Sequence, residues 1–281
     1  MQICRSTHQM RDWRKTVGRV ALVPTMGALH PGHLSLVARA RDWLDAQGGG
    51  HVVTSIFVNP TQFGPSEDLD RYPRDETGDL AKLSSAGCDA VFLPQVSDIY
   101  RPGAQTHVEV AGLGRMLMGR IRPGHFRGVA TVVTKLFNIT QPQAAAFGEK
   151  DYQQLTLIRR MVSDLDIPVQ ILPVPTMREA DGLAMSSRNQ RLTPADRAAA
   201  PVLARALDQA QALVAQGATL PALRRQIRAT LRTQPRAQIR SIDIRDADDL
   251  SRVHTLDRPV VILLAVRFGD VLLIDQRTAH P

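Results

Sequence analysis

The stretch Val-Ala-Leu-Val-Pro-Thr-Met-Gly-Ala-Leu-His-Pro-Gly-His, residues 20–33, determines how the chain begins to fold. Its first four residues are apolar and predict a buried strand that breaks at Pro24. Helical periodicity begins near His33, and Pro31 suits the first helical turn because the N–H that proline lacks would have no partner there. The segment therefore predicts a strand, a glycine-containing loop and a helix.

His30 and His33 lie at this predicted junction. Backbone N–H groups and the positive end of the helix dipole point the same way there, which favours an anion. Gly27 and Gly32 would let a phosphate approach the backbone closely. The spacing of three residues places both imidazoles on one edge of the helix. The alternative is that the two histidines merely line a surface loop.

Strands alternate with helical patterns through about residue 175. Strands are expected at 20–23, 52–58, 90–93, 144–147 and 169–174, and helices at 32–46, 75–86, 129–139 and 155–165, with a polar loop at 61–73. Such alternation predicts an α/β fold, with a Rossmann-like parallel sheet covered by helices on both faces. Ligands in such sheets bind at the carboxyl ends of the strands.

The pattern changes after Thr176. Helical character is expected over 194–216 and 220–231, a strand at 239–244, and a hairpin formed by 260–266 and 271–274 around Gly269-Asp270. This predicts a smaller α+β C-terminal domain, so the expected domains are residues 1–176 and 177–281.

The composition limits the class of protein. Hydrophobic residues make up 43 %, yet no apolar run approaches the ~20 residues of a membrane helix. The N-terminus has no apolar segment typical of a secretory signal. Cys4 and Cys88 form neither a disulfide framework nor a metal-binding spacing, so a cytoplasmic location is expected.

The net charge of +8 favours anionic partners. The chain has 31 arginines and only four lysines. Such a bias usually reflects the base composition of the genome, and it makes each remaining lysine notable. Arg224, Arg228 and Arg232 line one face of the second C-terminal helix, which is expected to be a solvated face. Aromatic residues are only 4 %, so stacking platforms are scarce and no nucleic-acid partner is expected.

Further polar clusters fall at the ends of elements. Asn59 and Gln62 follow a strand, and amides suit hydroxyl recognition, although they would also cap a turn. Lys150 is placed at a helix N-terminus, where a cation opposes the dipole unless an anion is bound, and Asp151 is alternatively a plain N-cap. Residues 186–188 offer two hydroxyls and an arginine for a triphosphate; the alternative is a polar hinge.

Five motifs occur in order: P-T-M-G-A-L-H-P-G-H (24–33), F-V-N-P-T-Q-F (57–63), R-P-G-H-F-R-G-V (122–129), F-G-E-K-D-Y-Q-Q-L (147–155) and G-L-A-M-S-S-R-N (182–189). Over nearly its whole length the chain resembles the pantothenate synthetase (pantoate–β-alanine ligase) family. Residues 30–33 resemble the H-x-G-H signature of the wider nucleotidyltransferase superfamily, and 185–188 resemble an altered form of its K-M-S-K-S loop.

The resemblance implies a homodimeric, ATP-dependent ligase that joins pantoate to β-alanine through a pantoyl adenylate, with Mg²⁺ held mainly by phosphate oxygens and water. The implied catalytic residues are His30, His33, Lys150, Ser186, Ser187 and Arg188. Contacts to the nucleotide and the intermediate are implied for Pro24, Thr25, Met26, Gly32, Gly148, Asp151, Met177 and Met185. Substrate contacts are implied for Asn59, Gln62, Tyr72 and Gln154, and an outer-shell role toward Mg²⁺ for Asp79.

One position departs from the family pattern: this chain has Met118 where members of the family often have Glu. A ligand contact made by that glutamate is therefore not expected here. Arg122, in the neighbouring motif, is not assigned a role. The alternative function is adenylation of another small molecule by an enzyme of the same superfamily. The amide pair Gln62 and Gln154 favours a neutral polyol-like acid over a phosphorylated substrate.

Overall fold

The computed structural model describes residues 1–64 and 69–281. Its contacts divide the chain into two compact units. Unit 1 comprises Met1–Gly148 and Gln153–Val174, and unit 2 comprises Glu149–Tyr152 and Pro175–Pro281. The main part of unit 2 thus starts two residues before the expected position 177, and the short segment 149–152 groups with it. Residues 65–68, inside the expected loop 61–73, lie outside the described part.

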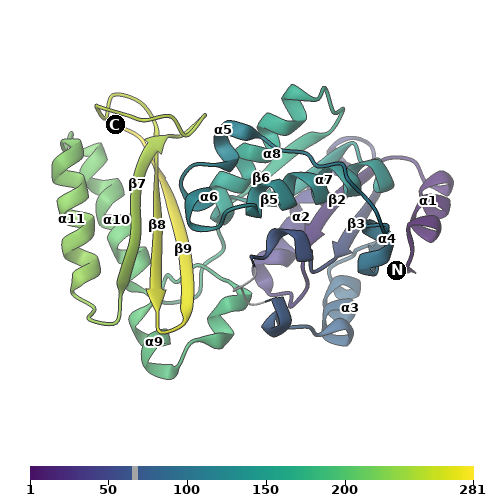
Figure 1. Cartoon of the computed structure of the whole chain (residues 1–281), viewed down its shortest axis with the longest axis horizontal. Coiled ribbons are helices and arrows are strands. Elements are labelled where there is room, and N and C mark those ends of the chain that lie inside the picture. The colour runs from purple at the N-terminus through teal and green to yellow at the C-terminus, as the bar shows by residue number, and fades with distance from the viewer. Residues whose placement is uncertain (65–68) are drawn as a thin grey trace. The chain divides into compact units, whose positions relative to one another are not determined.

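Unit 1 contains a six-stranded sheet in the order β1-β4-β3-β2-β5-β6, and every pair of neighbouring strands is parallel (Figure 1). The strands are β1 (Gln2–Cys4), β2 (Val20–Thr25), β3 (His51–Ile56), β4 (Ala90–Phe92), β5 (Ala144–Gly148) and β6 (Gln170–Val174). The strand order reverses between β2 and β5, which makes their carboxyl ends the expected ligand-binding edge.

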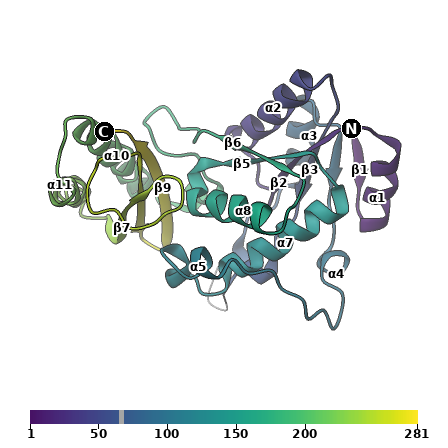
Figure 2. The same cartoon turned by 90° about the horizontal axis from the view of Figure 1, so that it is seen from above.

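Helices cover both faces of this sheet (Figure 2), so the side chains of β2 are buried on both sides. Val20 and Leu22 pack in one apolar cluster with α1 (Thr7–Thr16), α7 (His125–Thr140) and α8 (Tyr152–Asp164). Ala21 and Val23 pack in another with α2 (Pro31–Ala46) and α3 (Glu76–Ser85). The predicted α/β class is confirmed, whereas β1 and α1 were not expected from the sequence.

Short helical segments connect these elements. They are η1 (Pro60–Gln62), η2 (Leu69–Arg71), α4 (Val96–Ile99), α5 (Ala111–Gly114), α6 (Met118–Ile121) and η3 (Glu149–Asp151). The helix expected at 129–139 starts four residues earlier, at His125, where Gly124 adopts a left-handed conformation with φ +84°. Among the described residues, no helix combines the length and apolar character needed to span a bilayer.

Unit 2 packs helices on one face of an antiparallel sheet, in the order β7 (Gln238–Asp246), β8 (Val260–Phe268) and β9 (Val271–Ala279). Its other elements are η4 (Ser187–Arg191), α9 (Pro194–Ala199), α10 (Val202–Ala215) and α11 (Leu220–Arg232). The expected hairpin is confirmed, with Phe268 paired to Val271. The single helical stretch expected over 194–216 is wrong, because the chain breaks at 200–201, where Pro201 lacks an N–H.

Gly128 allows α7 to lie directly against η1. A Cβ at this position would be 2.4 Å from the carbonyl oxygen of Thr61 and 2.7 Å from the backbone nitrogen of Gln62. Both neighbours are backbone atoms of a short turn, so they cannot move aside as the end of a flexible side chain would.

Gly128→Ala should therefore lower the free energy of unfolding by about 1–3 kcal/mol, despite the higher helix propensity of alanine. Chemical denaturation measures the change. Gly112→Ala in α5 is the matched control, because a Cβ there meets nothing within 4 Å. Equal stability of the two variants would contradict the close approach.

Candidate active site

The loop between β2 and α2 turns sharply at two residues with positive φ. Gly27 has φ +83° and Ala28 has φ +50°. A Cβ on Gly27 would also lie 3.0 Å from an oxygen of Asp79, so glycine is required both for conformation and for space. Pro31 is the first residue of α2, as the sequence predicts. The predicted contacts Pro24, Thr25 and Met26 all lie at the carboxyl end of β2 or just beyond it.

His30 and His33 form a reciprocal cap at the start of α2. The backbone N–H of Gly32 donates to Nδ1 of His30 at 3.2 Å, and the backbone N–H of His30 donates to Nδ1 of His33 at 3.3 Å. The two ring centroids are 4.1 Å apart. Because each Nδ1 accepts a hydrogen bond, each neutral ring must carry its proton on Nε2. Both imidazoles thus present an Nε2–H donor, which suits phosphate oxygens.

The carboxylate of Asp79, on α3, binds the backbone of the loop between β2 and α2. Its two oxygens accept hydrogen bonds from the backbone N–H groups of Ala28, at 2.8 Å, and Leu29, at 2.7 Å. Lys82 donates to the carbonyl oxygen of Leu29 at 2.9 Å and lies 3.8 Å from the carboxylate. The Asp79 side chain is only 1 % exposed. It therefore fixes the backbone that leads into His30.

The expected outer-shell role of Asp79 toward Mg²⁺ stays a prediction. The carboxylate is engaged by two backbone donors. Within residues 1–64 and 69–281, no group of three or more His, Cys, Asp or Glu side chains is arranged to hold a metal ion.

Asn59, at the end of the β3 loop, is buried and makes hydrogen bonds at both ends of its amide. Its Oδ1 accepts from the backbone N–H and the hydroxyl of Thr61, at 3.3 and 2.9 Å, and from the hydroxyl of Tyr100 at 2.8 Å. Its Nδ2 donates to the carbonyl oxygen of Gly128 at 3.2 Å and to Oε1 of Gln62 at 3.0 Å. The amide thus links β3, α7 and η1.

Gln62 is held by its backbone as well as by its side chain. Its carbonyl oxygen lies 2.9 Å from Nδ1 of His125 and accepts from Arg122 at 3.3 Å. Its Nε2 lies 3.3 Å from Sδ of Met26, a weak acceptor. The side chains of Gln62 and Met26, both predicted to contact substrate or intermediate, are thus brought together. Arg122 binds the backbone carbonyl of Gln62 and so helps to hold this residue in place.

Two adjacent glutamines on α8 differ in their surroundings. Gln153 is buried and uses its amide to bind backbone groups of Leu113, Met116 and Met118. Gln154, the predicted substrate contact, is half-buried. Gln153 therefore secures the segment that contains Met118, the position that departs from the family pattern.

The remaining predicted positions of unit 1 are Tyr72 and Gly148. Tyr72 is buried and its ring packs edge-to-face on Phe63, with centroids 6.0 Å apart. Gly148 ends β5, next to β2 in the sheet, where a Cβ would meet only Leu36, at 4.0 Å. Unit 1 thus gathers the predicted contacts that lie on β2, β3 and β5 and their following loops.

Lys150 and Asp151 belong to η3, which groups with unit 2. Their charged groups lie 3.8 Å apart, and the lysine side chain is the more buried of the two. Lys150 was expected at the start of a helix. It lies instead in the 3₁₀ turn just before α8, because α8 begins at Tyr152.

A small hairpin in unit 2 brings Met177 and Met185 together. The backbone N–H of Met185 donates to the carbonyl of Met177 at 2.9 Å, and Arg178 pairs with Ala184 through a β-bridge. Gly182, with φ +88°, forms the turn. The two predicted nucleotide contacts are therefore neighbours at the open end of one hairpin.

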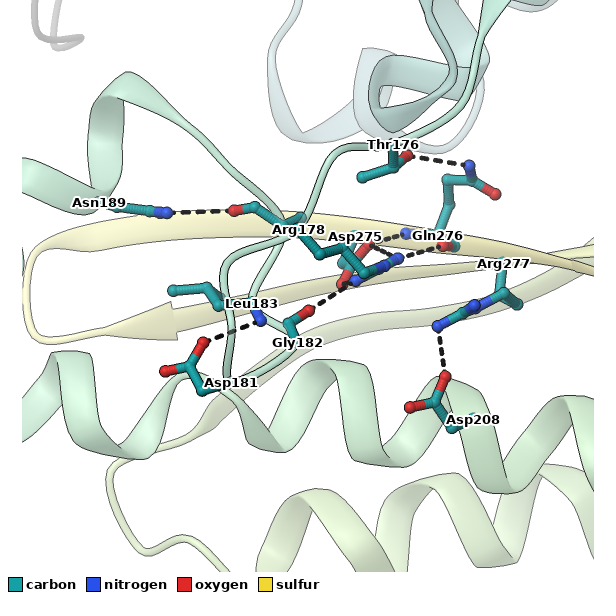
Figure 3. Close-up of polar contacts among 11 residues, drawn as sticks. Thr176, Arg178, Asp181, Gly182, Leu183, Asn189, Asp208, Asp275, Gln276 and Arg277 are labelled. Atoms are coloured by element: carbon teal, nitrogen blue, oxygen red, sulfur yellow. Dashed lines mark hydrogen bonds and ion pairs between the residues drawn. The ribbon is translucent and has the colours of Figure 1, made fainter. Parts of the chain in front are cut away.

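Arg178 anchors this hairpin to β9 (Figure 3). Its guanidinium makes two hydrogen bonds to the carboxylate of Asp275, at 2.8 and 2.9 Å, and donates to the carbonyl of Gly182 at 3.0 Å. The Asp275 side chain is 0 % exposed. Asn189 binds Glu179 and the carbonyl of Ala184, which joins η4 to the same hairpin.

The predicted triphosphate contacts, Ser186, Ser187 and Arg188, come directly after this hairpin in the chain. Ser186 caps η4, accepting from the backbone N–H of Arg188 at 3.3 Å. Ser187 is buried, whereas Ser186 and Arg188 are half-buried. The predicted ligand role of Ser186 stays a prediction, and its hydroxyl can still donate while it accepts this bond.

The sequence did not reveal three groups that hold predicted site residues in place. Tyr100 binds Asn59, His125 contacts the backbone of Gln62, and the Arg178–Asp275 pair anchors the hairpin that starts at Met177. Tyr100 is one of only three tyrosines in the chain, which is a weak signal. His125 lies in the quoted motif 122–129 but was given no role of its own. Burial raises the pKa of the Tyr100 hydroxyl, which therefore stays protonated and can donate to Asn59.

Comparison with known proteins identifies the family. The family model described as pantoate-beta-alanine ligase matches residues 2–278. The chain belongs to this family. Pantothenate synthetase of Agrobacterium fabrum is 50 % identical, over 99 % of this chain and 95 % of that protein. Pantothenate synthetase of Bartonella henselae is 52 % identical, over 92 % of this chain and 89 % of that protein.

Solved structures of pantoate–β-alanine ligases agree with the fold. Pantothenate synthetase from Thermus thermophilus superposes with a TM-score of 0.94 at 44 % identity, and the match covers 100 % of both chains. The ligase from Francisella tularensis, described as a complex with beta-gamma ATP and beta-alanine, superposes with a TM-score of 0.80 at 35 % identity, over 99 % of this chain and 97 % of that chain.

Asp79→Asn should lower both stability and turnover. One oxygen becomes an NH₂ group facing a backbone N–H, so a buried hydrogen bond is lost, at a cost of about 1–3 kcal/mol. Thermal unfolding and kcat measure the two effects, and raising the Mg²⁺ concentration should restore neither. Asp75→Asn is the control, because Asp75 caps α3 from an exposed position and asparagine caps equally well. Recovery of activity with Mg²⁺ would favour a metal role instead.

Arg178→Met should destabilise unit 2 by about 3–5 kcal/mol, because it leaves the buried Asp275 carboxylate without its partner. The free energy of unfolding in denaturant measures the loss. Arg197→Met is the matched control: Arg197 pairs with Glu179 and Asp181 of the same hairpin, but these carboxylates are 35 % and 42 % exposed, so water can solvate them and the loss should cost only about 1 kcal/mol. Similar losses in the two variants would contradict the anchoring role.

Proposed function

We propose that this chain catalyses the ATP-dependent ligation of pantoate to β-alanine, with pantoyl adenylate as the intermediate. The proposal is carried by one observation: in a member of the pantoate–β-alanine ligase family, two adjacent imidazoles at the start of α2 accept hydrogen bonds from backbone N–H groups at Nδ1, on the edge where the strand order reverses. ATP would enter as its Mg²⁺ complex, with the ion held mainly by phosphate oxygens and water.

In the first step, a carboxylate oxygen of pantoate attacks the α-phosphorus of ATP. The new O–P bond forms as the bond to diphosphate breaks, so pantoyl adenylate and diphosphate result. Pantoate is already ionised, so the step needs no general base. It needs alignment of the reactants and stabilisation of the charge that builds on the phosphates. His30, His33, Lys150, Ser186, Ser187 and Arg188 are the side chains we assign to that task.

In the second step, the amine of β-alanine attacks the acyl carbon, AMP leaves with the electron pair of the acyl–oxygen bond, and the amine gives up a proton. Gln62, Gln154, Asn59 and Tyr72 are assigned to pantoate. Pro24, Thr25, Met26, Gly32, Gly148, Asp151, Met177 and Met185 are assigned to the nucleotide and the intermediate. The neutral amides of the glutamines provide N–H donors for the hydroxyl and carboxylate oxygens of pantoate.

The direct test incubates the protein with ATP, Mg²⁺ and D-pantoate, with and without β-alanine. AMP and pantothenate should accumulate only when β-alanine is present. Without it, labelled diphosphate should be incorporated into ATP in a pantoate-dependent reaction, because formation of the adenylate is reversible. Absence of this exchange would contradict the adenylate route, and absence of pantothenate would contradict the ligase.

His33→Asn and His33→Ala should both lower kcat about 10²–10³-fold while changing the KM for ATP far less, because the charge that His33 meets is largest in the transition state. Comparing the two variants separates the loss of a catalytic group from the loss of the helix cap. The Oδ1 of asparagine can still accept from the His30 backbone N–H, so His33→Asn should keep the wild-type melting temperature. Comparable losses in kcat and in ATP affinity would argue against this role.

We also propose a homodimer in the cytoplasm. The dimer rests on the family resemblance, and light scattering at micromolar concentration would test it. The location rests on Cys4 and Cys88, which are buried free thiols and suit a reducing compartment.

A further inference from the structure

The orientation of the Asn59 amide is determined by backbone groups whose hydrogen-bonding roles cannot change. The N–H of Thr61 can only donate, so the atom 3.3 Å from it must be the oxygen of Asn59. The carbonyl oxygen of Gly128 can only accept, so the atom 3.2 Å from it must be the nitrogen. The two constraints agree, and the amide has a single orientation.

The orientation of Gln62 follows from that of Asn59. Nδ2 of Asn59 has a second hydrogen, and the side-chain atom of Gln62 that lies 3.0 Å away must therefore be the acceptor Oε1. Nε2 of Gln62 is then directed to the other side, beside Sδ of Met26 at 3.3 Å. Because sulfur is a weak acceptor, a ligand oxygen would be a better partner for this buried donor.

Tyr100 supplies the shortest hydrogen bond in this chain of contacts. Its hydroxyl donates to Oδ1 of Asn59 at 2.8 Å and lies 3.0 Å from the hydroxyl of Thr61. Its ring is tilted by 43° against that of Phe57, with centroids 6.3 Å apart, and its centroid lies 5.8 Å from Nζ of Lys135. Tyr100 thus binds Asn59, and Asn59 in turn donates to Oε1 of Gln62.

We propose that Tyr100 is a positioning residue of the pantoate subsite, acting through Asn59 to hold Gln62 with its Nε2–H donors toward a carboxylate or hydroxyl oxygen of the ligand. The proposal rests on the assignment of Gln62 to pantoate. It adds that this part of the subsite offers donors only, so it selects for an acceptor oxygen on the ligand.

The first test compares Tyr100→Phe with wild type in steady-state kinetics. Losing one neutral hydrogen bond should raise the KM for pantoate about fivefold, while kcat and the KM for ATP change less than about twofold. Tyr152→Phe is the matched control, because its hydroxyl donates to the carbonyl of Ala247 at 2.7 Å and not to the amide of Asn59. An unchanged KM for pantoate in Tyr100→Phe would overturn the proposal.

The second test is a double-mutant cycle with Gln62→Ala. If Tyr100 acts through Gln62, adding Tyr100→Phe to Gln62→Ala should change the KM for pantoate less than about twofold. An equal fold-change in both backgrounds would show that Tyr100 acts elsewhere and would overturn the proposal. Should Tyr100→Phe lower the melting temperature, Thr61→Val removes a second hydroxyl donor from Oδ1 of Asn59 and is expected to behave in the same way.

The outcomes separate this inference from the proposed function. If Gln62→Ala leaves the KM for pantoate unchanged, the assignment of Gln62 fails and the Tyr100 proposal fails with it, although the ligase activity stands. If Gln62→Ala raises that KM but Tyr100→Phe does not, only the Tyr100 proposal fails. If wild type forms no pantothenate at all, the proposed function itself fails.

Discussion

The two hydrogen bonds from the backbone of Ala28 and Leu29 to the carboxylate of Asp79 are the interaction on which the candidate active site depends. A non-glycine residue at φ +50° is disfavoured by about 1–2 kcal/mol, and the buried carboxylate offsets that cost with two charge-assisted bonds. With the loop fixed, α2 begins at Pro31 and His30 becomes its cap. The positions of both imidazoles follow from the position of one aspartate.

Backbone groups then determine the chemistry that each polar side chain presents. His30 and His33 accept at Nδ1 from backbone N–H groups, so their donors are at Nε2. His125 has the opposite arrangement, because its Nδ1 faces the carbonyl oxygen of Gln62, which can only accept. Asn59 is oriented by one N–H and one carbonyl. Because main-chain groups fix these orientations, the side chains lose little conformational freedom when a ligand binds, which lowers the cost of binding.

The two units position their predicted ligand contacts by different means. In unit 1 the contacts lie at the ends of parallel strands whose faces are both buried, so the sheet itself is rigid support. In unit 2, Met177, Met185 and the residues up to Arg188 lie on a hairpin and a short turn, whose anchor is the ion pair of Arg178 with the buried Asp275.

The sequence by itself determined the elements whose signal is local. Four apolar residues at 20–23 identify a strand buried on both faces, and the three-residue spacing of His30 and His33 places their rings side by side. The hairpin around Gly269-Asp270 is equally local. The family motifs added the residues assigned to ATP and pantoate, because each motif is a short continuous stretch.

Only the tertiary structure decided which groups hold that site in place. Asp79 and Ala28 are 51 residues apart in sequence, Tyr100 and Asn59 are 41 apart, and Arg178 and Asp275 are 97 apart. Periodicity describes the faces of one element and contains no information on which distant element packs against it. The break at Pro201 falls inside an alanine-rich stretch whose composition predicts one continuous helix. The partners of Asp79, Tyr100 and Arg178 follow from the packing of segments that are distant in the sequence.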